Sequence, residues 1–192
     1  MQSQSGSGKT LAFLVGVLQQ IDRAYDGCQC IVLLNTFELA VQTVAVFDEL
    51  TEDMPWATRM ECLKGYDVES FRFKFYIGTP GRTLACVTQA VARGELDPAR
   101  VRFFVIDEAD FILDPSKTST TKSIFQQTYD VYRQLTGAPQ TIVVSATISA
   151  GLVAMVQKVL GTSYGSILSA PRGSPPASRR RARSRRRSAS SS

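Results

Sequence analysis

Short apolar runs alternate with polar and helical segments along this 192-residue chain. Four runs are rich in β-branched and aromatic residues, which predicts β-strands at 29–34, 73–78, 101–106 and 140–145. The first strand is followed by a segment of helical spacing at 38–50. This alternation predicts an α/β fold, with a mostly parallel sheet and helices on both of its faces.

Two later segments also have helical spacing. Residues 118–135 are expected to form an amphipathic helix, whose inward side chains are Ile124, Phe125 and Val131. Residues 150–160 are expected to form another helix, with apolar residues near one face at Leu152, Val153, Val156, Val159 and Leu160. Ile167 and Leu168 are expected to close the sheet as a last strand. We therefore expect one structured domain over residues 1–170.

The basic character of the chain is concentrated at its C-terminal end. The net charge is +5, but eight arginines and no acid follow Pro171, so residues 1–171 carry a net charge of −3. Residues 171–192 contain no large apolar side chain, which predicts a disordered tail. Four interpretations of this tail stay open: non-specific RNA binding, nuclear localisation, phosphorylation on serine, or a product of a wrong gene boundary or shifted frame.

Composition excludes several kinds of chemistry. The chain has no histidine, and its four cysteines lack a Cys-x-x-Cys spacing, which argues against a zinc site and excludes a histidine base. The cysteines are interpreted as buried, reduced thiols of an intracellular protein. No apolar run is long enough to span a bilayer, and no basic residue precedes Lys9 as in a signal peptide, so no membrane partner is expected.

A run of small residues near the N-terminus has the composition of a phosphate-binding loop. It consists of Ser5, Gly6, Ser7, Gly8, Lys9 and Thr10. Backbone amides in such a loop approach phosphate oxygens closely, and the helix that follows adds its positive N-terminal dipole. Lys9 would reach the β- and γ-phosphates, and the Thr10 hydroxyl would ligate Mg²⁺. Ser3 stands where the strict pattern has glycine, so a flexible turn is the alternative.

An acidic pair follows the third predicted strand. Asp107 is the natural second contact to Mg²⁺, through water, and Glu108 is the candidate to orient or deprotonate the attacking water. Phosphoryl transfer depends mainly on positioning and charge neutralisation, so no covalent intermediate is required. The alternative is an acidic helix N-terminus with Asp107 as its cap. The glycine-rich run about one hundred residues upstream favours the catalytic interpretation.

Five short motifs together resemble the first core domain of the DEAD-box RNA helicases. They are Gly6–Thr10, Glu38–Ala40, Thr79–Arg82, Asp107–Asp110 and Ser145–Thr147. The resemblance spans residues 2–168 and implies a RecA-like fold, ATP and Mg²⁺ as cofactors, and ATP hydrolysis coupled to RNA binding and unwinding. Ser3 and Phe37 are most similar to the mRNA-export subgroup. A location in the nucleus, the cytoplasm or both is compatible with it, as are protein activators.

The resemblance also implies roles for individual residues. Lys9, Thr10, Asp107 and Glu108 would serve ATP and Mg²⁺. Asp110 would join Ser145 and Thr147 in a polar link that couples hydrolysis to strand separation. The residues that would line the RNA backbone are Thr36, Glu38, Gly65, Thr79, Gly81 and Arg82. Contacts to a backbone carry no sequence information, so RNA binding is expected to be independent of sequence.

The chain also departs from the family pattern. Asn35 replaces the usual proline, Phe37 the usual arginine, and Tyr66 the second glycine of a glycine pair. The adenine-recognition motif and the strand supporting the phosphate loop would lie upstream of residue 1, which predicts N-terminal truncation. A second core domain, which supplies arginines to the γ-phosphate in this family, does not follow Pro171.

We therefore expect the chain alone to turn over ATP slowly or not at all. The main alternative is a non-catalytic module, derived from a helicase, that binds RNA or a protein partner. A different phosphate-loop ATPase is disfavoured, because it would not explain Glu38–Ala40, Thr79–Arg82 and Ser145–Thr147 together.

Overall fold

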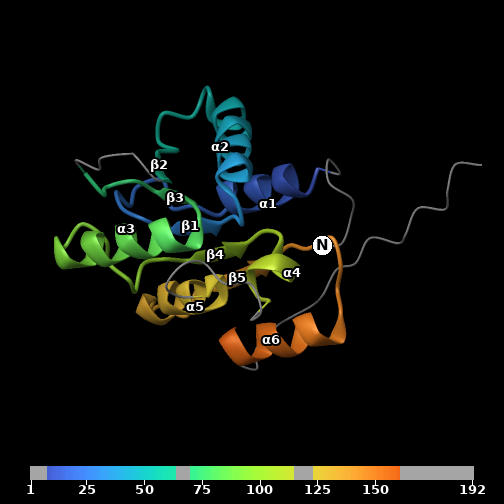
Figure 1. Ribbon diagram of the computed structural model, residues 1–192. Helices are drawn as coiled ribbons and strands as arrows, with labels where there is room; N and C mark the ends of the chain where they lie inside the picture. Colours follow the sequence, from blue (N-terminus) through green and yellow to red (C-terminus); the bar gives the residue numbers. More distant parts are fainter. Residues whose placement is uncertain (1–7, 64–69, 115–122, 161–192) are drawn as a thin grey trace, which may run out of the picture.

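A computed structural model describes the backbone of residues 8–63, 70–114 and 123–160, with side chains up to residue 157 (Figure 1). Within these ranges five parallel strands form one sheet in the order β2–β3–β1–β4–β5. The strands are β1 (Cys30–Leu33), β2 (Arg59–Cys62), β3 (Phe75–Gly78), β4 (Phe103–Ile106) and β5 (Gln140–Val143). The predicted parallel α/β architecture is confirmed.

Helices cover both faces of the sheet (Figure 1). They are α1 (Lys9–Leu18), α2 (Phe37–Thr51), α3 (Pro80–Ala92), α4 (Ala109–Ile112), α5 (Ile124–Gln134) and α6 (Ala150–Leu160). Helices α1 and α2 pack on one face, and α3, α5 and α6 contribute to the core on the other. In the described part of the chain, no helix is both long and apolar enough to cross a membrane.

Strand side chains alternate between two apolar cores. Ile31 and Leu33 enter the core beneath α3 and α5, whereas Cys30 and Val32 enter the core beneath α1 and α2. The register places Ile31 between Tyr76 and Phe104, and both of these aromatic side chains face the same core as Ile31. Because both faces of the central strands are buried, their sequences are continuous apolar runs rather than alternating ones.

The predicted elements differ from the observed ones mainly at their ends. All four expected strands are present in shortened form, and the helices expected at 38–50 and 150–160 are α2 and α6. In α5, which the Ser123 hydroxyl caps, Val131 is buried and Ile124 and Phe125 pack partly buried against the core. The expected strand at Ile167 and Leu168 and the tail at 171–192 lie outside the described residues.

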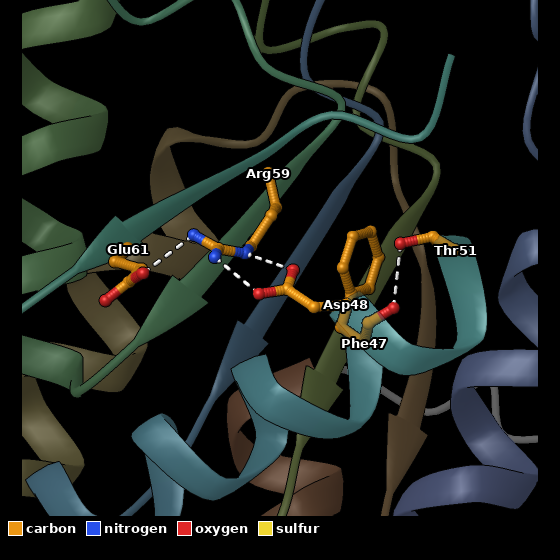
Figure 2. Close-up of polar contacts among 5 residues, drawn as sticks. All are labelled: Phe47, Asp48, Thr51, Arg59 and Glu61. Carbon is orange, nitrogen blue, oxygen red and sulfur yellow. Dashed lines mark hydrogen bonds and ion pairs between the residues drawn. The ribbon is translucent and has the colours of Figure 1, made fainter. Parts of the chain in front are cut away.

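Strand β2 was not predicted, because it has only four residues and no continuous apolar run, although polar and apolar residues alternate along it. Met60 and Cys62 are buried, whereas Arg59 and Glu61 point to the partly exposed face. Figure 2 shows how the Arg59 guanidinium donates two 2.7 Å hydrogen bonds to the Asp48 carboxylate of α2 and one of 2.7 Å to Glu61. This edge strand is therefore fastened to α2 by a charged cluster as well as by its core side chains.

Strands β2 and β3 approach closely at the end of the ladder. Gly78 pairs with Cys62, and a Cβ at Gly78 would lie 2.1 Å from the Cys62 carbonyl oxygen. That contact is far shorter than van der Waals distance, and the obstacle is backbone rather than a flexible side chain. Only glycine therefore fits at this position, directly before the Thr79–Arg82 motif.

Candidate functional site

Most of the predicted site residues that the structure describes follow the carboxyl ends of the strands. Backbone hydrogen bonds continue the sheet by one residue at each junction: Asp107 N–H donates to Leu33 O (3.0 Å), and Val144 N–H to Ile106 O (2.8 Å). Leu34 N–H likewise donates to Gly78 O (2.9 Å). These hydrogen bonds hold the strand ends side by side at the carboxyl edge of the sheet, which is where open parallel sheets bind ligands.

Helix α1 begins at this candidate site with a glycine in left-handed conformation. Gly8 caps the helix with φ 76° and ψ 13°, and its carbonyl accepts the Ala12 N–H at 2.9 Å. Lys9 and Thr10 occupy the first turn and are half-buried. The first-turn amides of a helix have no intrahelical acceptors and suit an anion. Ser5, Gly6 and Ser7 of the predicted phosphate loop lie outside the described residues.

Asp107 is a buried carboxylate directly after β4, with 8% of its surface exposed. Its Oδ1 accepts the Glu108 N–H at 2.9 Å. Burial raises the pKa of Asp107, while the Glu108 N–H and the positive charge of Lys9 act in the opposite direction. Lys9 therefore lies near enough to Asp107 for its charge to act on that carboxylate.

Glu108 is held in an unusual backbone conformation. It has φ 51° and ψ 47°, a left-handed geometry that is uncommon outside glycine, and it caps the short helix α4. Asp107 Oδ1 and Val144 O fix the amides on either side of this residue, the second by a 3.0 Å bond from Ala109 N–H. Strain of this kind concentrates at functional sites. Glu108, not Asp107, is therefore the cap of the following helix.

The pKa of Glu108, like that of Asp107, is raised above its ordinary value. Partial burial raises its pKa, and the negative charges of Asp107 and Asp110 raise it further. The Asn35 side chain and the charge of Lys9 act against this rise. In the sequence, Asn35 is recognised only as a departure from the family pattern.

Asp110, Ser145 and Thr147 form the polar link that the resemblance implied. The Thr147 hydroxyl donates to Asp110 Oδ2 at 2.9 Å, joining the ends of β4 and β5. Ser145 is 2% exposed; its hydroxyl donates to Thr147 O (2.6 Å) and accepts the Thr147 N–H (3.1 Å). These bonds bring the three residues together without testing the role predicted for them.

The residues predicted to contact RNA cluster at two neighbouring helix starts. Thr36 caps α2 by accepting the Leu39 N–H at 3.3 Å, and the exposed Glu38 lies in the first turn. Thr79 is the N-cap residue of α3, which begins at Pro80 directly after the end of β3. Gly81 is exposed. Arg82 donates from Nε to Leu63 O at 3.1 Å. Gly65 lies outside the described residues.

A parallel α/β sheet with an anion-binding helix start, a lysine and a buried carboxylate at its carboxyl edge defines the class of nucleotide-binding α/β domains. Within that class, the chain belongs to the DEAD/DEAH box helicase family, whose family model matches residues 1–155.

Individual relatives agree with this assignment. The chain is 36% identical over 163 residues to the ATP-dependent RNA helicase FAL1 of Meyerozyma guilliermondii, and 34% identical over 166 residues to fal1 of Schizosaccharomyces pombe. Each alignment covers 82% of this chain and 38% of the relative. The chain thus spans well under half the length of the curated relatives that it matches.

Comparison with solved structures also finds similarity to DEAD-box proteins. S. cerevisiae Dbp5 bound to RNA and ADP BeF3 superposes with a TM-score of 0.72 at 27% identity, over 88% of this chain and 41% of Dbp5. A DEAD box protein from Methanococcus jannaschii superposes with a TM-score of 0.67 at 23% identity, over 83% of this chain and 42% of that one, and shows the fold alone. The fold is therefore that of a RecA-like DEAD-box domain.

Proposed function

We propose that this chain is the nucleotide-binding core domain of an ATP-dependent RNA helicase, in which ATP hydrolysis is coupled to sequence-independent RNA binding. The observation that carries the proposal is the convergence of Lys9, Asp107 and Glu108 at one strand-end edge, where the charge of Lys9 acts on both carboxylates. ADP BeF3 and RNA are bound to the structural neighbour Dbp5, which supports the same ligands here.

The described residues fit a magnesium–nucleotide complex. The start of α1 offers backbone amides and the ammonium of Lys9 to phosphate oxygens, and the Thr10 hydroxyl is a hard oxygen ligand. Asp107 is a buried carboxylate whose charge Lys9 offsets only in part, which suits a divalent cation. A cation held by Thr10 and Asp107 would supply positive charge that offsets the charge of the phosphate oxygens. The predicted phosphate ligands Ser5, Gly6, Ser7 and Gly8 precede Lys9 directly.

Glu108 would act on water rather than on the cation. Its backbone is held in a left-handed conformation at the end of β4, and partial burial, followed by the charges of Asp107 and Asp110, keeps its pKa above the ordinary value. A carboxylate so held can orient a water molecule and accept its proton. Asp110, through its 2.9 Å hydrogen bond with Thr147, would couple changes at the nucleotide site to the segment that follows β5.

The RNA path would run along the starts of α2 and α3. Thr36, Glu38, Thr79, Gly81 and Arg82 lie at the ends of the adjacent strands β1 and β3, and Gly65 would extend the path. Hydroxyl groups, amides at helix starts and a guanidinium bind phosphate without reading bases. Protein partners are a further part of the proposal, because Dbp5 has been solved bound to Nup159 and Gle1.

The test is ATP hydrolysis by the purified chain, with and without single-stranded RNA, alone and mixed with the C-terminal remainder of a FAL1 relative. Hydrolysis stimulated by RNA in the mixture, and lost in Lys9→Ala and Glu108→Gln, is the expected result. RNA binding that is equal with and without ATP, and no hydrolysis in any mixture, would instead indicate a non-catalytic binding module.

A further inference from the structure

Helices α3 and α5 lie side by side on one face of the sheet (Figure 1). Two glutamines of α5, separated by about two helical turns, reach α3. The Gln134 side chain contacts the Thr88 hydroxyl, to which its Nε2 donates at 3.1 Å. Gln127 contacts Gly81, about two turns before Thr88. The two contacts are therefore successive steps along a pair of helices that run in the same direction.

The contact at Gly81 fills the space that a side chain of its own would need. A Cβ at Gly81 would lie 2.6 Å from Gln127 Oε1 and 3.4 Å from Gln127 Cδ, and the first distance is shorter than van der Waals contact. The backbone does not itself require glycine here, because Gly81 lies within α3, and the glycines with left-handed backbone in the described ranges are Gly8 and Gly94. Glycine at this position therefore leaves room for the side chain of Gln127.

This contact lies at the start of α3, on the proposed RNA path. Gly81 is exposed, and Gln127 is half-buried beside it. Thr79 makes no side-chain cap hydrogen bond to α3, in contrast to Thr36, which caps α2. A side-chain amide at such a helix start can donate to a phosphate oxygen and can also accept from a ribose 2′-hydroxyl. Gln127 thus presents, at the position of Gly81, a neutral group that suits an RNA backbone.

We propose that Gln127 is an RNA-contacting residue, and that position 81 is glycine in order to admit its side-chain amide. This inference rests on the proposed function, because it places Gln127 on the same RNA path. Gly81 then acts through Gln127 and not through a close approach of its own backbone to RNA. Gln127 belongs to α5, outside the five motifs that carry the family resemblance, so those motifs do not identify it.

The proposal is tested by the affinity of the purified chain for a fluorescently labelled single-stranded oligouridylate, measured by anisotropy. Gln127→Ala should lower the affinity by about threefold to tenfold, which corresponds to the loss of one hydrogen bond. Gly81→Ala should lower it equally, because the added Cβ would push the Gln127 amide aside. The obstacle is the far end of a flexible side chain, so the helix should stay folded, which thermal unfolding checks. The double variant should bind no more weakly than either single variant.

Gln134→Ala is the matched control for these variants. It removes the other glutamine that joins α5 to α3, about two turns away from the RNA path, and should leave the affinity unchanged. An unchanged affinity in Gln127→Ala overturns the proposal. So does a loss in Gly81→Ala that has the same size with and without Gln127, because Gly81 would then matter through its own backbone.

A charge substitution separates contact with RNA from a merely structural role. Gln127→Glu keeps the size of the side chain and one of its oxygens, but places a negative charge beside the RNA backbone. It should weaken binding more than Gln127→Ala does, and the difference should shrink as the salt concentration rises. Gln134→Glu should have a smaller effect, since it carries the same charge about 10 Å further along the helix. Binding in Gln127→Glu that is as tight as in the unsubstituted chain overturns the contact.

The two proposals fail in different ways. If the unsubstituted chain binds no RNA, its proposed RNA path and the role of Gln127 fall together. If RNA binding is lost in Arg82→Ala but is insensitive to both substitutions at Gln127, the RNA path stands and only the role of Gln127 fails.

Discussion

Asp107 illustrates how a single residue can cost stability in exchange for a function. Its carboxylate is buried after β4, and burial raises its pKa despite one backbone hydrogen bond and the charge of Lys9. Folding the nucleotide-free chain therefore places an ionised group in an environment that disfavours ionisation. A bound cation would remove that penalty, which is a common relation between stability and function at binding sites.

Replacement of Asp107 by asparagine should accordingly stabilise the nucleotide-free chain at neutral pH. A raised carboxylate pKa in the folded state means that the folded state holds its proton to higher pH than the unfolded state, so stability is lost as pH rises between the two pKa values. The advantage of Asp107→Asn should be full above the folded pKa and should disappear below the ordinary value. Thermal unfolding from pH 3 to about pH 8 measures it; an advantage that grows toward low pH would contradict this account.

At the residue scale, the sequence identified which groups follow the strands, and the family resemblance implied the link between Asp110 and Thr147, but most other contacts were not predicted. Asp107, Glu108 and Ser145 were expected at strand ends from the apolar runs before them, and they lie there. The hydrogen bond from Asp107 N–H to Leu33 O depends on the pairing of β1 with β4. Pairing between strands distant in sequence leaves no trace in the local pattern, so no reading of residues 33–37 alone would have found it.

At the scale of elements, the start of α1 depends on one glycine. Gly8 has φ 76°, a conformation that costs an ordinary L-residue about 1 kcal/mol or more, although nothing lies within 4 Å of the position that its Cβ would take. The constraint is therefore on the backbone and not on space. Gly16 in the same helix also has open space at its Cβ position, but its backbone is helical, so the two glycines form a matched pair.

Alanine substitutions at the two glycines are predicted to change the free energy of unfolding in opposite directions. Gly8→Ala should destabilise the chain by about 1 kcal/mol, whereas Gly16→Ala should stabilise it by about 0.5–1 kcal/mol. In a chain of this size each kcal/mol moves the unfolding midpoint by about 2–4 °C, so calorimetry can resolve the signs. Gly8→Ala should also weaken nucleotide binding, and Gly16→Ala should not. Equal effects of the two substitutions would show that the left-handed cap does not matter.

The elements that were predicted share a physical origin, and so do those that were missed. Central strands β1, β3 and β4 are buried on both faces and read as apolar runs, which made them visible. Edge strand β2 exposes one face partly and is joined to α2 through Arg59 and Asp48, so its four residues alternate and contain no apolar run long enough to be recognised (Figure 2). The Thr79–Arg82 motif follows the end of β3, where a loop is ordinarily found, but Pro80 suits the first turn of a helix, and α3 begins there.

At the scale of the whole molecule, the parallel sheet brings motifs that are distant in sequence to one of its edges. Lys9, Asn35, Thr79, Asp107 and Ser145 come from five separate stretches of sequence, and the order β2–β3–β1–β4–β5 sets the last four at neighbouring strand ends (Figure 1). The family match over residues 1–155 and the Dbp5 superposition agree with that arrangement. The whole-protein activity of relatives more than twice as long, and the extent of the domain over 1–170, remain proposals for this chain.

The most direct measurement is the affinity of the purified chain for an ATP analogue by titration calorimetry, with and without Mg²⁺. We predict saturable binding that is strengthened by Mg²⁺, lost in Lys9→Ala, weakened in Asp107→Asn and retained in Glu108→Gln, because Glu108 acts on water and not on the nucleotide. Binding of equal strength in Lys9→Ala and in the unsubstituted chain would contradict the central claim that the carboxyl edge of this sheet is a nucleotide site.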